Sequence, residues 1–135
     1  MALKASELKV GDTYTERLVE DLKRTTIVQY AGASGDYNPV HTDEIFTKDV
    51  AGYPSVFAHG MLTMGMTGRM LTNYVGDGRL TEFGVRFTSQ VFPGDTLDST
   101  ATVTALHDGL VDLDVSTVNQ DGVEVAKGSA QARVD

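Results

Sequence analysis

The chain has 135 residues, of which none is cysteine and only three are proline. Without thiols it forms no disulfide, no thiolate nucleophile and no metal site built on cysteine. The three histidines, His41, His59 and His107, are 18 and 48 residues apart and match no metal-ligand motif. We therefore expect neither a metal nor another cofactor, and the lack of cysteine favours a reducing compartment such as the cytoplasm.

Basic residues and long apolar runs are also scarce, and both shortages restrict the partners. The net charge of -8 disfavours nucleic-acid binding, which requires a basic surface. The most apolar stretch, residues 56–75, is interrupted by His59, Arg69 and Asn73, whereas a membrane span needs about 20 apolar residues. Residues 1–20 contain no apolar segment of the length that a signal peptide requires. We expect no nucleic acid and no membrane among the partners.

Size and composition indicate a globular domain. A chain of 135 residues is long enough for one hydrophobic core and too short for two ordinary domains. Its 41% hydrophobic and 22% charged residues are typical of soluble globular proteins. We expect residues 1–135 to form one domain.

The second half of the chain alternates apolar and polar residues, which predicts β-strands. Four such segments follow residue 76, with the turn-forming triplets PGD, HDG and QDG between them: residues 83–91, 97–106, 110–118 and 123–134. They predict an antiparallel meander of four long strands. A fifth strand is expected at residues 13–19, after the Gly11-Asp12 turn.

The first half of the chain predicts two short helices. One begins with Thr25 or Thr26 as its cap, since a threonine hydroxyl can accept a hydrogen bond from a helix amide, and ends near residue 32. The other covers residues 42–48, with its cap at one of its first two residues, Thr42 or Asp43.

A third, longer helix begins at His59 or Gly60 and ends at Gly76, a residue type that favours the end of a helix. Its apolar residues occur nearly all round the helix, so we expect the rest of the fold to enclose it. A long apolar helix wrapped by a curved antiparallel sheet is the hot-dog arrangement. The predicted fold class is therefore α+β, a single hot-dog domain with a long central helix.

The segment GDYNPVH, residues 35–41, contains a carboxylate and an imidazole, Asp36 and His41. Aspartate and asparagine favour turns, and Pro39 restricts both itself and Asn38, so the segment can be a polar turn and nothing more. Alternatively, histidine titrates near neutral pH, and a carboxylate beside it would suit the pair to acid/base catalysis. The segment alone leaves both interpretations open.

A second segment, AHGML at residues 58–62, lies where the long helix begins. The first amides of a helix have no partner within it, and Gly60 leaves room for an oxygen atom to approach them. A thioester carbonyl that gains enolate character would be stabilised there. The simpler interpretation is that Gly60 serves helix packing and that His59 is a half-buried histidine with its hydrogen bonds satisfied.

Together, SGDYNPVH at residues 34–41 and HGML at residues 59–62 resemble the motif of the MaoC-like, (R)-specific enoyl-CoA hydratase family. The turn FPGD at residues 92–95 is similar to a turn of the same family. The resemblance implies a hot-dog domain that works as a dimer, with active sites near the dimer interface. It implies a site with these members: Asp36 and His41 as the catalytic dyad, Asn38 as a structural or substrate-binding residue, His59 as a substrate-binding residue, and the Gly60 N–H as donor to the thioester oxygen.

The resemblance also implies a hydro-lyase of fatty-acid metabolism. Such an enzyme adds water to trans-2-enoyl thioesters to give (R)-3-hydroxyacyl thioesters, or runs the reverse dehydration. The substrate would be a thioester of CoA or of an acyl carrier protein. We favour acyl-CoA, because an acidic carrier protein would need a local basic patch on a chain of net charge -8.

Two alternatives stay open. In the first, the chain is a hot-dog acyl-CoA thioesterase. Such enzymes usually rely on a carboxylate in the long helix, and residues 60–75 contain no Asp or Glu, which counts against this alternative. In the other alternative, the chain is the catalytic subunit of a hetero-oligomeric 3-hydroxyacyl-ACP dehydratase, a heterodimer instead of a homodimer or higher homo-oligomer.

Overall fold

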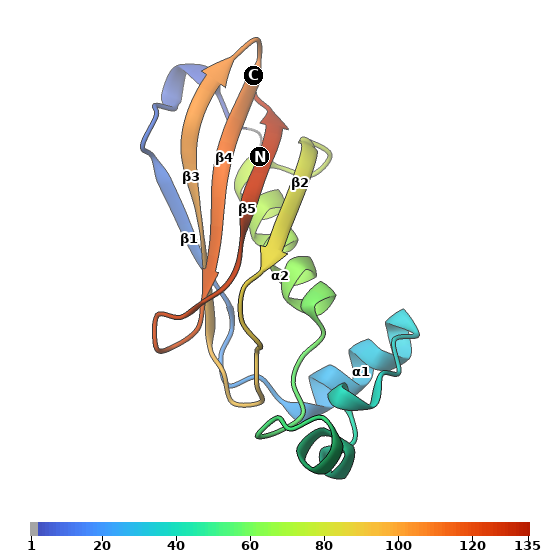
Figure 1. The fold of residues 1–135 in the computed structure, drawn as a ribbon. Helices are drawn as coiled ribbons and strands as arrows, with labels where there is room; N and C mark the ends of the chain where they lie inside the picture. The colour runs from blue at the N-terminus through green and yellow to red at the C-terminus, as the bar shows by residue number, and fades with distance from the viewer. Residues whose placement is uncertain (1–2) are drawn as a thin grey trace.

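The computed structural model describes residues 3–135 and contains one sheet and one long helix. The strands are β1 (Thr13–Val19), β2 (Leu80–Phe87), β3 (Leu97–His107), β4 (Leu110–Val118) and β5 (Glu124–Arg133). The helical segments are η1 (Ala5–Glu7), α1 (Arg24–Ser34), η2 (Pro39–His41), η3 (Phe46–Val50) and α2 (Gly60–Val75). The strands are antiparallel in the order β1-β3-β4-β5-β2, and α2 crosses one face of the sheet (Figure 1). The sheet and α2 form the predicted hot-dog fold. The short helical segments α1, η2 and η3 gather beyond the first turn of α2 (Figure 1).

Alternating burial explains why the predicted strands form. On β4, Val111, Leu113 and Val115 are buried, while the residues between them are more exposed. The bounds predicted for β1, β3, β4 and β5 are confirmed to within one residue. The hairpin between β3 and β4 turns at Asp108 and Gly109, whose positive φ angles of 53° and 74° fit a type I′ turn.

The strand predicted at residues 83–91 is wrong in its bounds and in its place in the sheet. β2 ends at Phe87 and pairs with β5, so it forms the edge opposite β1 and the four strands are not a simple meander. Thr88 still donates its N–H to Val125 O (2.9 Å), and further along the chain Val91 O accepts a hydrogen bond from the Ala58 N–H (2.7 Å). The backbone after β2 therefore bonds to the segment that leads into α2.

The long helix has the predicted bounds, and Gly76 ends it with a φ of 98°. Its predicted enclosure is wrong, because one sheet covers only one of its faces. Five residues of α2 are buried: Thr63, Thr67, Met70, Leu71 and Val75. Met61, on the open side, is 55% exposed. Within residues 3–135, neither α2 nor any other helix is long and apolar enough to cross a membrane.

The shorter helices differ from the prediction at their ends. The N-cap position of α1 is Lys23, which makes no side-chain cap bond, so neither predicted threonine caps this helix. The helix predicted at residues 42–48 is the π-helical segment η3, which starts at Phe46. Ile45 occupies its N-cap position, and the predicted Asp43 is bonded to its first residue, since Asp43 Oδ1 accepts a hydrogen bond from the Phe46 N–H (3.0 Å).

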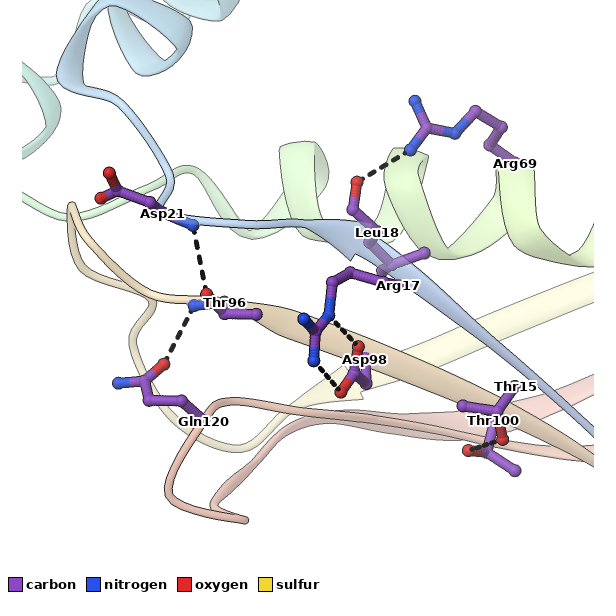
Figure 2. Close-up of polar contacts among 9 residues, drawn as sticks. All are labelled: Thr15, Arg17, Leu18, Asp21, Arg69, Thr96, Asp98, Thr100 and Gln120. Carbon is purple, nitrogen blue, oxygen red and sulfur yellow. Dashed lines mark hydrogen bonds and ion pairs between the residues drawn. The ribbon is translucent and has the colours of Figure 1, made fainter.

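Polar contacts tie both α2 and β3 to β1 (Figure 2). Arg69 of α2 donates to Leu18 O (3.0 Å) on β1. Arg17 of β1 donates two hydrogen bonds to Asp98 of β3 (3.0 and 3.3 Å), and these bonds hold the pKa of Asp98 below its ordinary value. Since β1 is fixed by both elements, the start of the segment that leads to α1 is fixed as well.

β5 and β2 approach each other closely at Gly128. A Cβ there would lie 1.9 Å from Gly84 O and 2.7 Å from Val85 Cα, which are backbone atoms of β2. These atoms cannot move without disturbing the β2–β5 pairing, so we expect Gly128→Ala to lower the free energy of unfolding by about 2 kcal/mol or more. Gly84→Ala is the control, because a Cβ at Gly84 meets nothing within 4 Å. Urea unfolding of both variants checks this packing, which would be refuted if they proved equally stable.

Candidate functional site

The loop between α1 and η2 is a polar turn built by its own side chains. Gly35 ends α1 with a φ of 77°, a left-handed conformation that glycine adopts without strain. Asp36 Oδ1 accepts a hydrogen bond from the Asn38 N–H, and Asn38 Oδ1 accepts one from the Val40 N–H, each at 3.2 Å. These bonds reverse the chain and bring His41 to face Asp36.

His41 is buried at the end of η2, and its hydrogen bond defines its tautomer. Its Nδ1 lies 2.7 Å from Phe57 O, and a carbonyl oxygen can only accept, so Nδ1 carries the hydrogen. When the ring is neutral, Nε2 is therefore an acceptor. It lies 3.9 Å from Asp36 Oδ2, too far for a hydrogen bond, yet both atoms can lie about 2.8 Å from one water oxygen. The Asp36 side chain is 52% exposed and that of His41 is 9% exposed, so the pair lies where the buried interior meets solvent.

His59 lies deeper than His41 and contacts both members of this pair. It is 1% exposed, and its Nε2 lies 3.0 Å from the backbone oxygen of Asp36. Its ring stacks on the ring of His41, with centroids 3.8 Å apart and planes inclined by 23°. Tyr30 of α1 meets the same ring edge-on, at a centroid distance of 4.9 Å. The spacing of the histidines in the sequence does not predict this stacked pair.

Gly60 begins α2 and borders a cavity of about 330 Å³. His59 precedes it at the N-cap position and makes no side-chain bond to the helix, so the first amides of α2 lack a side-chain cap. The ring of Phe87 lies against Gly60, since a Cβ at Gly60 would be only 2.8–3.0 Å from its atoms. Phe57 lines the cavity, and its carbonyl oxygen accepts the hydrogen bond from His41, so the cavity and the Asp36–His41 pair share this residue.

An ion pair joins the helical segments on either side of the loop. Arg24, at the start of α1, donates to Glu44, just before η3, and this hydrogen bond holds the pKa of the Glu44 carboxyl below its ordinary value. Exposed ion pairs contribute little to stability. The contact nevertheless restricts how far the two segments can separate around the loop.

Asp36, His41 and His59 bring three ligand atoms within 4.8 Å of one another, as a metal site does. Their geometry disfavours chelation, because two imidazoles bind one ion with lone pairs that converge, whereas stacked rings direct their lone pairs in nearly parallel planes. The arrangement suits acid/base chemistry better than metal binding.

The five predicted site residues do not all lie at one place in the structure. Asp36, His41 and His59 lie together, Gly60 borders the cavity, and the side-chain oxygen of Asn38 is used in the turn. His59 is not among the residues that line the cavity, and its burial disfavours the predicted contact with substrate.

Sequence reasoning missed Phe57 and Phe87. The carbonyl of Phe57 orients His41, and a backbone carbonyl has no sequence signature. Phe87 lies in the strand predicted at residues 83–91, and alternation gives no sign that its ring contacts α2. The one hint in the sequence is that residue 60 is a glycine, which has no Cβ to collide with this ring.

Residues 6–125 match the family model described as "MaoC like domain". The chain belongs to the MaoC-like dehydratase family. Among curated relatives, 3-hydroxyacyl-thioester dehydratase Y of Mycobacterium tuberculosis is 44% identical over 69 residues, which are 49% of this chain and 24% of that protein. The matched segment thus spans about a quarter of that relative's length.

Solved structures with the MaoC-like fold cover nearly the whole chain. The (R)-hydratase PhaJ1 of Pseudomonas aeruginosa, in its unliganded form, is 27% identical with a TM-score of 0.82, over 98% of this chain and 86% of that one. A chain of the ChsH1–ChsH2 complex of Mycobacterium tuberculosis is 23% identical with a TM-score of 0.81, over 94% of this chain and 98% of that one, and shows the fold alone. The family therefore includes hydratases and 3-hydroxyacyl-thioester dehydratases, and its fold occurs in a complex of two named proteins.

Gly35 sets the direction in which the loop leaves α1. We expect Gly35→Ala to destabilise the protein by about 1 kcal/mol, because an L side chain is strained at a φ of 77° even though nothing lies within 4 Å of the new Cβ. Gly32→Ala, inside α1, also meets nothing within 4 Å and should stabilise by up to about 1 kcal/mol, since alanine favours helices. Thermal unfolding compares them, and a Gly35→Ala variant as stable as Gly32→Ala would rule out the left-handed turn.

Proposed function

We propose that the protein is a hydro-lyase that adds water to trans-2-enoyl thioesters to give (R)-3-hydroxyacyl thioesters, or runs the reverse dehydration, in fatty-acid metabolism. The observation that carries the proposal is the 3.9 Å separation between Asp36 Oδ2 and His41 Nε2, in a chain of the MaoC-like family. Both atoms are hydrogen-bond acceptors when Asp36 is ionised and His41 is neutral. A water between them would donate one hydrogen to each.

A water held in this way is oriented for attack. Because its two O–H bonds point at Asp36 and His41, a lone pair of its oxygen points away from them, toward the β-carbon of a bound enoyl thioester. As the C–O bond forms, the pair takes one proton from the water, and one proton is delivered to the α-carbon. A hydroxyl and a hydrogen are thereby added across the double bond, and dehydration retraces the same steps.

The start of α2 would stabilise the negative charge that develops during this step. Electrons displaced from the double bond collect on the thioester oxygen, and we propose that the Gly60 N–H donates a hydrogen bond to this oxygen. The amide lies at the positive end of the helix dipole, and Gly60 borders the cavity that the acyl thioester would enter. Donors directed at such an oxygen typically contribute about 10²–10³-fold in rate.

The acyl group would occupy the cavity beside Gly60. Its lining includes Phe57, Phe87, Val91 and Val125, whose side chains suit a hydrocarbon chain. A volume of about 330 Å³ is near the lower end of the range of ligand sites, about 300–1,000 Å³. We favour a CoA thioester, because the net charge of -8 opposes an acidic carrier protein.

Asp36→Asn and His41→Ala test the pair directly. Each change removes one of the two acceptors for the water, so we expect each to lower kcat/KM for hydration of crotonyl-CoA by about 10²–10⁴-fold. Loss of the enoyl absorbance measures the rate, and chiral analysis of the product should give the (R) alcohol.

Two substitutions away from the pair serve as matched controls. Asp121→Asn changes a carboxylate in the turn between β4 and β5, and His107→Ala changes a histidine at the β3–β4 hairpin, at the far end of the sheet from α1 (Figure 1). Both should keep wild-type rates. If Asp36→Asn or His41→Ala also keeps the wild-type rate of hydration, the substituted residue is not catalytic. Release of free CoA thiol without hydration would instead indicate a thioesterase.

We propose that the protein acts as a homodimer that uses the edge formed by β2. This strand is the last in the sheet order, and Phe87 on it is 46% exposed and lines the cavity. Met61, in the first turn of α2, is 55% exposed. Exposed apolar side chains next to an edge strand are typical of an interface. Light scattering after gel filtration should give twice the chain mass of 14.5 kDa. A monomer that gains activity only with a second MaoC-like chain would indicate a heterodimer instead.

A further inference from the structure

His59 occupies the N-cap position of α2 without capping the helix. Its side chain makes no bond to the helix amides, and its Nε2 instead lies 3.0 Å from the backbone oxygen of Asp36, 23 residues earlier. The residue is 1% exposed and is not among those that line the cavity. Its side chain thus serves neither the helix terminus nor the wall of the cavity.

The hydrogen bond to Asp36 fixes the tautomer of His59. The carbonyl oxygen can only accept, so Nε2 carries the hydrogen and Nδ1 carries the lone pair. Nδ1 is buried and finds no hydrogen-bond partner among residues 3–135. An unsatisfied buried polar atom lowers stability, so packing alone does not explain a histidine at this position.

The ring of His59 reaches both members of the proposed dyad. It holds Asp36 through the backbone oxygen and lies face to face with His41, at a centroid distance of 3.8 Å. The other hydrogen bonds of Asp36 among the described residues are local: its N–H donates to Ser34 Oγ, and its Oδ1 accepts from the Asn38 N–H. Both partners are two positions away, so these bonds shape the loop without anchoring it. The bond from His59 is therefore the one that ties Asp36 to the start of α2.

We propose that His59 is a positioning residue that sets the distance between the Asp36 carboxylate and His41 Nε2, so that one water fits between them. The inference rests on the proposed hydratase function, and it replaces the substrate contact that the sequence motif suggests for His59. Loss of the Nε2–H would release the Asp36 peptide and change the 3.9 Å separation while leaving the cavity wall intact. The rate of the chemical step should fall, and substrate binding should change little.

Two amide substitutions at His59 distinguish the effect of its hydrogen bond to Asp36 O from the effect of merely having a polar side chain there. The side-chain nitrogen of glutamine lies as many bonds from Cα as Nε2 of histidine, and that of asparagine as many as Nδ1. His59→Gln can therefore donate to Asp36 O, and His59→Asn cannot. For crotonyl-CoA hydration we expect His59→Asn to lower kcat about 10²-fold with KM within about threefold, and His59→Gln to recover about tenfold or more of that loss.

Equal kcat values for the two variants would overturn the inference. So would a raised KM with unchanged kcat, since that result would make His59 a substrate contact. If the wild-type protein hydrates no enoyl-CoA, the proposed function itself fails, and that outcome is recognised before any variant is compared.

Nitrogen-15 NMR of the histidine rings tests the geometry without relying on activity or on the folding of a variant at position 59. We expect the Nε2–H tautomer for His59 and the Nδ1–H tautomer for His41 in the wild-type protein. His107→Ala assigns the signals of the third histidine, which lies on β3. A Nδ1–H tautomer at His59 would remove the bond to Asp36 and with it the positioning role.

Discussion

Two histidine rings, each bonded to a backbone carbonyl of the other's segment, fix the geometry on which the site depends. His41 comes from the loop after α1 and donates to Phe57 O, just before α2, while His59 comes from the start of α2 and donates to Asp36 O in the loop. The rings stack between these two bonds. Because the bonds cross between the same two segments in opposite directions, the loop cannot move along α2 without losing one of them.

The sheet makes one of these segments rigid. Met70 and Leu71 of α2 are fully buried against the strands, and the approach to the helix is held by the bond from the Ala58 N–H to Val91 O. One sheet covers only one face of α2, so the first turn of the helix stays open to the cavity. A surface loop with polar side chains is thus fastened to a rigid helix start, which is the usual way a fold positions reactive groups.

The sequence predicts the elements well and their contacts poorly. Alternation locates β4 and the end signal of Gly76 locates α2, because both depend on local residue order. The pairing of β2 with β5 joins segments that are far apart in the sequence, and the stacking of His41 on His59 depends on tertiary packing. Neither contact has a local signal in the sequence. The motif marks Asp36 and His41 as candidates, while the atoms that orient them belong to a backbone carbonyl and a second histidine.

We propose that Asp36 and His41 share one water, and a high-resolution crystal structure of the unliganded protein would show whether it is there. We predict an ordered water within about 3 Å of both Asp36 Oδ2 and His41 Nε2. The His59 and His41 rings should each remain within hydrogen-bond distance of the carbonyl oxygen of the other's segment. A direct hydrogen bond between the Asp36 carboxylate and His41 Nε2, with no water between them, would contradict the claim.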